Sequence, residues 1–158
     1  MSVDVLVAGV GNIFMRDDAF GCEVARRLAA EPLPDGVRVT DYGIGGLHLA
    51  YDIADGVGTL ILLDALPHAG EPGEVVLVEA ALDELHTSTI DAHGMDPATV
   101  LTAVRNLGVE PPRTLVVGCR PASLEEGIGL SPVVAAAVEP AARTVLGLLQ
   151  LDLASKEH

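Results

Sequence analysis

The chain alternates between short apolar runs and segments whose apolar residues recur at helical spacing. Five runs are predicted to be strands, and three of them are almost continuous valine, leucine and isoleucine. The five are Val3–Ala8, Val37–Asp41, Thr59–Asp64, Glu74–Val78 and Arg113–Gly118. Unbroken apolar runs of this length are typical of strands that are buried on both faces of a mostly parallel sheet.

Between the strands, apolar residues return every three or four positions, which predicts amphipathic helices. These segments cover residues 20–28, 47–53, 97–107 and 132–149. Asp96 and Ser131 are expected to cap the last two helices, each of which opens with a proline at its first position. Pro140 predicts a kink inside the final helix.

The connection between the third and fourth strands is too short for a helical crossover. Residues 65–73 supply nine positions, whereas a parallel crossover needs about a dozen or more. The fourth strand is therefore expected to be antiparallel and near an edge. We predict one α/β domain over residues 1–151, a three-layer α/β/α sandwich with a five-stranded mostly parallel sheet, followed by a frayed tail at 152–158.

Charge and composition narrow the classes of function. The 158 residues carry a formal net charge of −14, which disfavours nucleic acid or an anionic membrane as partner and favours a cation or a basic protein surface. No apolar run looks long enough to span a bilayer, and no secretory signal is visible, so we expect a cytoplasmic protein. Cys22 and Cys119 form no disulfide framework or zinc motif and are expected to be core residues.

The first strand leads into a turn that looks like the start of a nucleotide-binding unit but lacks its chemistry. Phe14 stands where the dinucleotide fingerprint has its third glycine, and Asp17 and Asp18 place negative charge where a phosphate would sit. Carboxylates at the end of a strand suit a cation better. A non-catalytic nucleotide- or metal-binding module, with Asp41 as the ribose-binding acid, is kept as the alternative.

Other polar residues follow the carboxyl ends of the parallel strands, where open α/β sheets bind ligands. Asp64 ends the third strand, and His93 lies in the loop before the next helix. Two carboxylates, such as Asp18 and Asp64, with one imidazole form a donor set that suits zinc or nickel better than magnesium. The structural alternatives are a helix-dipole role for Asp18 and solvation for His93. Cys119 is a weaker candidate, as a thiolate nucleophile.

Four segments resemble the hydrogenase maturation endopeptidases, which trim the C-terminus of nickel–iron hydrogenase large subunits. They are Gly9–Gly21, Leu62–Ala65, Ala92–Gly94 and Gly118–Pro132, and the resemblance extends over nearly the whole chain. It implies that the partner is a nickel-loaded large-subunit precursor, which loses a C-terminal peptide. It also implies that Asp18, Asp64 and His93 bind the nickel delivered with that precursor, and that zinc or cadmium can take the same site in vitro.

The resemblance leaves two mechanisms open. If the metal polarises the scissile carbonyl, Asp17 is a candidate general base beside the three ligands; otherwise the metal only docks the substrate. Family members often carry glutamate in place of Asp18. Many read Asp-Gly-Gly-Thr where this chain has Asp41–Gly46, so this loop is expected to contribute to substrate choice. The predicted recognition residues are Asn12, Asp41, Gly43 and Gly45.

Overall fold

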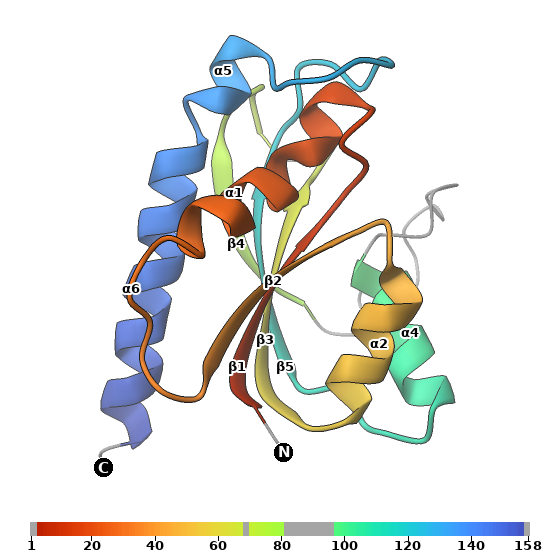
Figure 1. The fold of residues 1–158 in the computed structure, drawn as a ribbon, viewed down its shortest axis with the longest axis vertical. Coiled ribbons are helices and arrows are strands. Elements are labelled where there is room, and N and C mark those ends of the chain that lie inside the picture. Colours follow the sequence, from red (N-terminus) through yellow and green to blue (C-terminus); the bar gives the residue numbers. More distant parts are fainter. Residues whose placement is uncertain (1–2, 68–69, 81–96, 157–158) are drawn as a thin grey trace.

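A five-stranded sheet lies between two layers of helices (Figure 1). The computed structural model describes residues 3–67, 70–80 and 97–156, the last six by their backbone alone. The strands are β1 (Val3–Val10), β2 (Val37–Gly43), β3 (Val57–Ala65), β4 (Val75–Ala80) and β5 (Arg113–Cys119). Their order across the sheet is β2-β1-β3-β5-β4, and β4 is antiparallel to β5 at one edge while the other neighbours are parallel. The predicted fold class and the reversed fourth strand are confirmed.

The helices divide between the two faces because alternate residues of the strands point to opposite sides. The helical elements are η1 (Arg16–Ala19), α1 (Phe20–Leu28), α2 (Gly46–Ala54), α4 (Pro97–Asn106), α5 (Pro132–Ala135) and α6 (Val138–Lys156). Val5 and Val7 of β1 share one core cluster with residues of α1 and α6. Leu6 and Ala8 of the same strand share the other cluster with residues of α2 and α4.

The last helical segment differs from the prediction. The predicted distortion takes the form of a break at Ala136 and Ala137 rather than a kink inside one continuous helix. In a continuous helix the ring of Pro140 would clash with the carbonyl of Ala136, four residues earlier. Pro140 is the third residue of α6, where its missing N–H removes no helical hydrogen bond. The backbone of α6 continues to Lys156, beyond residue 151 at which the domain was expected to end.

One stretch among the described residues, Pro132–Gln150, has the length and mean hydropathy (1.4) of a helix that could cross a membrane. The sequence prediction had found no such run. Core helices of soluble proteins have the same length and hydropathy, so this stretch alone does not indicate a membrane-spanning segment. In the structure Val134, Ala141, Val145 and Leu149 of this stretch are buried in the cluster shared with α1 and the sheet.

Candidate active site

The β1–α1 loop emerges at the carboxyl edge of the sheet, between the ends of its two neighbouring strands. Gly9 of β1 pairs with Asp41 of β2 on one side and with Leu63 of β3 on the other. Asp64, the next residue of β3, pairs with Gly118 of β5. The parallel register therefore brings Asp41 and Asp64 to the same edge as the loop that carries the acidic pair of residues 17 and 18.

Asp18 is positioned by the tight turn that precedes it. The backbone N–H of Asn12 donates to Asp18 Oδ2 at 2.8 Å. Gly11 has a φ of 142°, and a Cβ at this position would collide with the carbonyl oxygen of Asp18. Only glycine therefore allows the chain to fold back this closely. Gly11, the second glycine of the turn, thus lets the Asp18 carboxylate lie against the turn.

Asp64 is a buried acid, with 6% of its surface exposed. The η1 turn that contains Asp18 contacts β3 directly. A Cβ at Gly21, at the start of α1, would collide with the carbonyl oxygen of Leu63, so the absence of a side chain lets this helix rest on the end of β3. The structure thus brings the segments of Asp18 and Asp64 together at one edge.

The third predicted ligand, His93, lies outside the described residues, so the ligand set of Asp18, Asp64 and His93 stays a prediction. Among the side chains that the structure describes, in residues 3–67, 70–80 and 97–150, no group of three His, Cys, Asp or Glu residues is placed to hold a metal ion. Two carboxylates from separate elements are nevertheless suitable donors for a divalent cation whose other ligands come from elsewhere.

Asp17 has a different environment from its neighbour. It is completely buried. Its Oδ2 accepts hydrogen bonds from Ala122 N (2.8 Å), Ser123 N (2.9 Å) and Ser131 Oγ (2.8 Å), and its Oδ1 accepts one from Ser131 N (2.7 Å). Burial alone raises the pKa of Asp17, but the hydrogen bonds from Ser131, Ser123 and Ala122 outweigh it and hold the pKa below its ordinary value.

This geometry argues against Asp17 as the general base. A base needs an accessible oxygen and a pKa near the working pH, whereas the Asp17 carboxylate is buried, accepts four protein hydrogen bonds and has a lowered pKa. Its role is to anchor the β1–α1 loop to residues 122–131. Ser131 was expected to cap α5, but its side chain makes no capping bond and donates to Asp17 instead.

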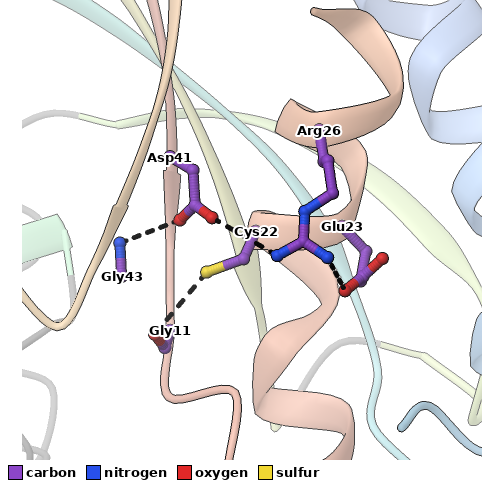
Figure 2. A network of polar contacts seen from close by, with 6 residues as sticks. All are labelled: Gly11, Cys22, Glu23, Arg26, Asp41 and Gly43. Carbon is purple, nitrogen blue, oxygen red and sulfur yellow. Dashed lines mark hydrogen bonds and ion pairs between the residues drawn. The ribbon is translucent and has the colours of Figure 1, made fainter.

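Two of the predicted recognition residues, Asp41 and Gly43, lie at the end of β2 beside α1 (Figure 2). Asp41 Oδ1 accepts from Gly43 N at 3.0 Å, and Asp41 Oδ2 lies 3.9 Å from Arg26 Nη2. Arg26 Nη1 also contacts Glu23 Oε1 at 3.2 Å. These contacts connect the end of β2 to the exposed face of α1. Gly43 has a φ of 58°, a conformation that glycine adopts readily.

The same region contains the remaining predicted residues. Asn12 Oδ1 accepts from Phe14 N at 2.9 Å, which closes a local turn in the β1–α1 loop. Gly45 N donates to Tyr42 O at 2.9 Å just before α2 begins. Asn12 and the loop from Asp41 to Gly45 therefore sit at the edge where the substrate is expected, and their role in recognition stays a prediction.

Both cysteines are buried, as expected from the sequence. The Cys22 thiol donates to Gly11 O at 3.6 Å, under the glycine turn (Figure 2). Burial, together with the charge of Asp17, raises the pKa of Cys119 to about 11. A thiol with this pKa is protonated at neutral pH, so the structure does not support Cys119 as a thiolate nucleophile.

Comparisons with known proteins agree with this architecture. The family model described as hydrogenase maturation protease matches residues 22–148. The hydrogenase 2 maturation protease of Escherichia coli strain K12 is 38% identical over 149 residues, covering 92% of this chain and 90% of that protein. A putative hydrogenase maturation protease of Methanocaldococcus jannaschii is 34% identical, covering 91% of this chain and 95% of that protein.

Solved structures show the same likeness in three dimensions. The hydrogenase maturating endopeptidase HybD from Escherichia coli has a TM-score of 0.81 at 37% identity, covering 94% of this chain and 93% of that chain. The [NiFe] hydrogenase maturation protease HybD from Thermococcus kodakarensis has a TM-score of 0.74 at 26% identity, covering 93% of this chain and 99% of that chain. The protein therefore belongs to the hydrogenase maturation protease family and is an endopeptidase.

Proposed function

We propose that this protein removes a C-terminal peptide from the nickel-loaded precursor of a nickel–iron hydrogenase large subunit. The observation that carries the proposal is the meeting of the Asp18 and Asp64 segments at one edge of the sheet, in a chain of this protease family. A pair of carboxylates at that edge suits a cation presented by the substrate. We propose a metal-dependent rather than an aspartic-type reaction, and a cytoplasmic location stays a prediction.

In this proposal the nickel ion is part of the substrate. Asp18 and Asp64 offer it two oxygen donors, and His93 is proposed to add a nitrogen donor. A nickel ion held there can polarise the scissile carbonyl or lower the pKa of a water. The residues of the chain then orient the precursor, and Asp17 keeps the loop of Asp18 in place through its bonds to residues 122–131. Zinc or cadmium is expected to occupy the same donors in vitro.

No observation favours the alternative of a nucleotide-binding module. Phe14, at the position of the third glycine, is a bulky side chain with 62% of its surface exposed. Asp41, the candidate ribose-binding acid, is engaged by Gly43 N and lies beside Arg26. The first helical turn after β1 carries Asp17 and Asp18. Their negative charge disfavours binding of a phosphate at this position.

The proposal is tested by incubating the protein with a nickel-loaded and a nickel-free large-subunit precursor and measuring intact masses over time. We expect only the nickel-loaded precursor to lose a C-terminal peptide. Equal trimming of both forms would contradict nickel as the recognition signal. Persistence of both precursors at full length, with a protein that is folded by circular dichroism, would contradict the proposed reaction on that substrate.

A further inference from the structure

The β1–α1 loop and the segment before α5 are joined into one rigid unit, which we call the two-loop platform and define as residues 12–18 and 120–131. Gly127 N donates to Phe14 O at 2.8 Å, and Arg16 N donates to Gly127 O at 3.1 Å. Asp17 N donates to Ser123 O at 3.1 Å. The buried carboxylate of Asp17 accepts further hydrogen bonds from Ser123 N and Ser131 N of the same segment. Two loops more than a hundred positions apart thus have one shared backbone framework.

The Arg16 side chain reinforces this framework. Arg16 has a φ of 45°, a conformation that is uncommon for a residue other than glycine. Its guanidinium lies over Gly127, where an added Cβ would be 2.8 Å from three of its atoms. The platform is therefore fixed by backbone bonds, by a buried carboxylate and by a covering cation, and the side chains that it displays are held in a defined arrangement.

The platform displays large apolar side chains to solvent. The exposed fractions are 62% for Phe14, 67% for Ile128 and 39% for Ile13. Exposed apolar residues are ordinary when scattered, but a group of them on a rigid surface is typical of a binding site. Phe14 is one of only two phenylalanines in the chain, and the fold places it in water although the other one, Phe20, is fully buried.

A groove of about 370 Å³ is lined in part by two of these side chains, Ile13 and Ile128, while Phe14 lies outside its lining. Its lining includes Ile13, Ile128 and Leu130, together with the Arg26 and Glu23 pair. Because Arg26 contacts Glu23 at 3.2 Å, the two charges balance each other, and the lining is otherwise apolar. A groove of this composition fits an uncharged apolar segment better than a charged one.

We propose that the two-loop platform and its groove dock the large-subunit precursor, through an apolar segment of that protein. The inference rests on the proposed function. Asp18 belongs to the same loop as Ile13 and Phe14 and accepts a hydrogen bond from Asn12 N, so a protein that brings its nickel to Asp18 reaches the loop that displays these side chains. Continuity with the candidate active site and the balanced charge of the groove identify the occupant as this substrate.

The test is a steady-state measurement of trimming with the full-length protein and nickel-loaded precursor. We expect Phe14→Ser and Ile128→Ser each to raise KM about tenfold, the range for a well-packed apolar anchor at an interface. The kcat should stay within about twofold, because neither side chain is a donor to the metal or the scissile bond. Thermal melts should be unchanged, since both side chains are exposed.

Leu107→Ser is the matched control. Leu107 is 38% exposed and follows the end of α4. It lies on the side of the sheet where the parallel strands begin, whereas the platform lies where they end. Its substitution should change neither KM nor kcat. An unchanged KM in the Phe14→Ser, Ile128→Ser double variant would overturn the docking proposal, provided that the wild-type protein trims. Absence of trimming by the wild-type protein would instead contradict the proposed function itself.

A second copy of this chain is the competing occupant. Sedimentation velocity of the wild-type protein is expected to show the same species as the double variant. A dimer that dissociates on Phe14→Ser, with KM for the precursor unaffected, would show that the platform is an interface between copies and would overturn its assignment to the substrate.

Discussion

The substitution Asp17→Asn tests whether Asp17 anchors the β1–α1 loop or acts as the general base. The substitution keeps the size of the side chain and leaves a single acceptor oxygen. Placed at the Oδ2 position, that oxygen keeps the bonds from Ala122 N, Ser123 N and Ser131 Oγ. The amide nitrogen then faces Ser131 N, which loses the acceptor that it has at 2.7 Å in the wild-type protein.

The expected loss of stability follows from these contacts. Hydrogen bonds to a charged acceptor contribute roughly twice as much as neutral ones, and a buried donor without a partner costs about 1–3 kcal/mol. Weakening of three bonds and loss of the fourth should lower the free energy of unfolding by about 3 kcal/mol at pH 7. For a chain of this size, that corresponds to a fall in Tm of roughly 6–12 °C.

The effect has a defined pH dependence. The pKa of Asp17 is lowered in the folded protein from an ordinary value of 3.8, so the carboxylate stabilises the fold above that pH. This contribution is lost as the pH falls through the folded pKa. Urea or thermal melts of wild type and Asp17→Asn should therefore differ less at pH 3 than at pH 7.

Ser131→Ala is the control, because it removes only the hydroxyl donor and should cost about 1 kcal/mol. Trimming by Asp17→Asn, measured well below its Tm, should persist at a reduced rate. The reasoning is refuted if Asp17→Asn melts within about 0.5 kcal/mol of the wild type at pH 7, the range of an ordinary surface change. A variant with wild-type stability and no trimming would restore Asp17 as a catalytic base.

Three further predictions address the site. His93→Ala should abolish trimming in the intact-mass assay while its thermal melt stays within about 0.5 kcal/mol of the wild type, as for a surface change; trimming at the normal rate would remove His93 from the ligand set. Iodoacetamide at pH 7 should leave trimming intact because the pKa of Cys119 is raised to about 11, and inactivation by a mass adduct on Cys119 would contradict this. Gly21→Ala should lower stability by about 2–3 kcal/mol and reduce trimming, since its Cβ collides with Leu63 O; a normal urea midpoint would show that α1 does not need this close approach.

The fold was predictable because its signals are local. Continuous apolar runs mark strands that are buried on both faces, and the nine residues between the third and fourth strands forced the reversal of β4. The break at Ala136 and Ala137 has a local cause in the sequence, because the ring of Pro140 would clash with the carbonyl of Ala136, four residues earlier, in a continuous helix. The prediction placed the distortion at Pro140 itself, whereas the chain breaks about one turn earlier and Pro140 then lies in the first turn of α6, where proline is tolerated.

The site was predictable in part. The acids that follow β1 and end β3 stood out because they interrupt apolar strands at the edge where such sheets bind ligands. Asp17 and Asp18 looked alike in sequence, and their different roles depend on partners that are distant along the chain. Ser131 is 114 positions from Asp17. Spacing alone does not reveal such a contact, and the role of the Gly118–Pro132 block as the partner of the β1–α1 loop emerged only from the structure.

The most direct test of the central claim is the intact mass of nickel-loaded precursor after incubation with wild type, Asp64→Asn and Leu107→Ser. Asp64→Asn retains the shape of a buried side chain and removes its charge. If the carboxylates at the sheet edge form the active site, wild type and Leu107→Ser should release the C-terminal peptide, while folded Asp64→Asn should leave the precursor at full length. Trimming by Asp64→Asn at the wild-type rate would contradict the account.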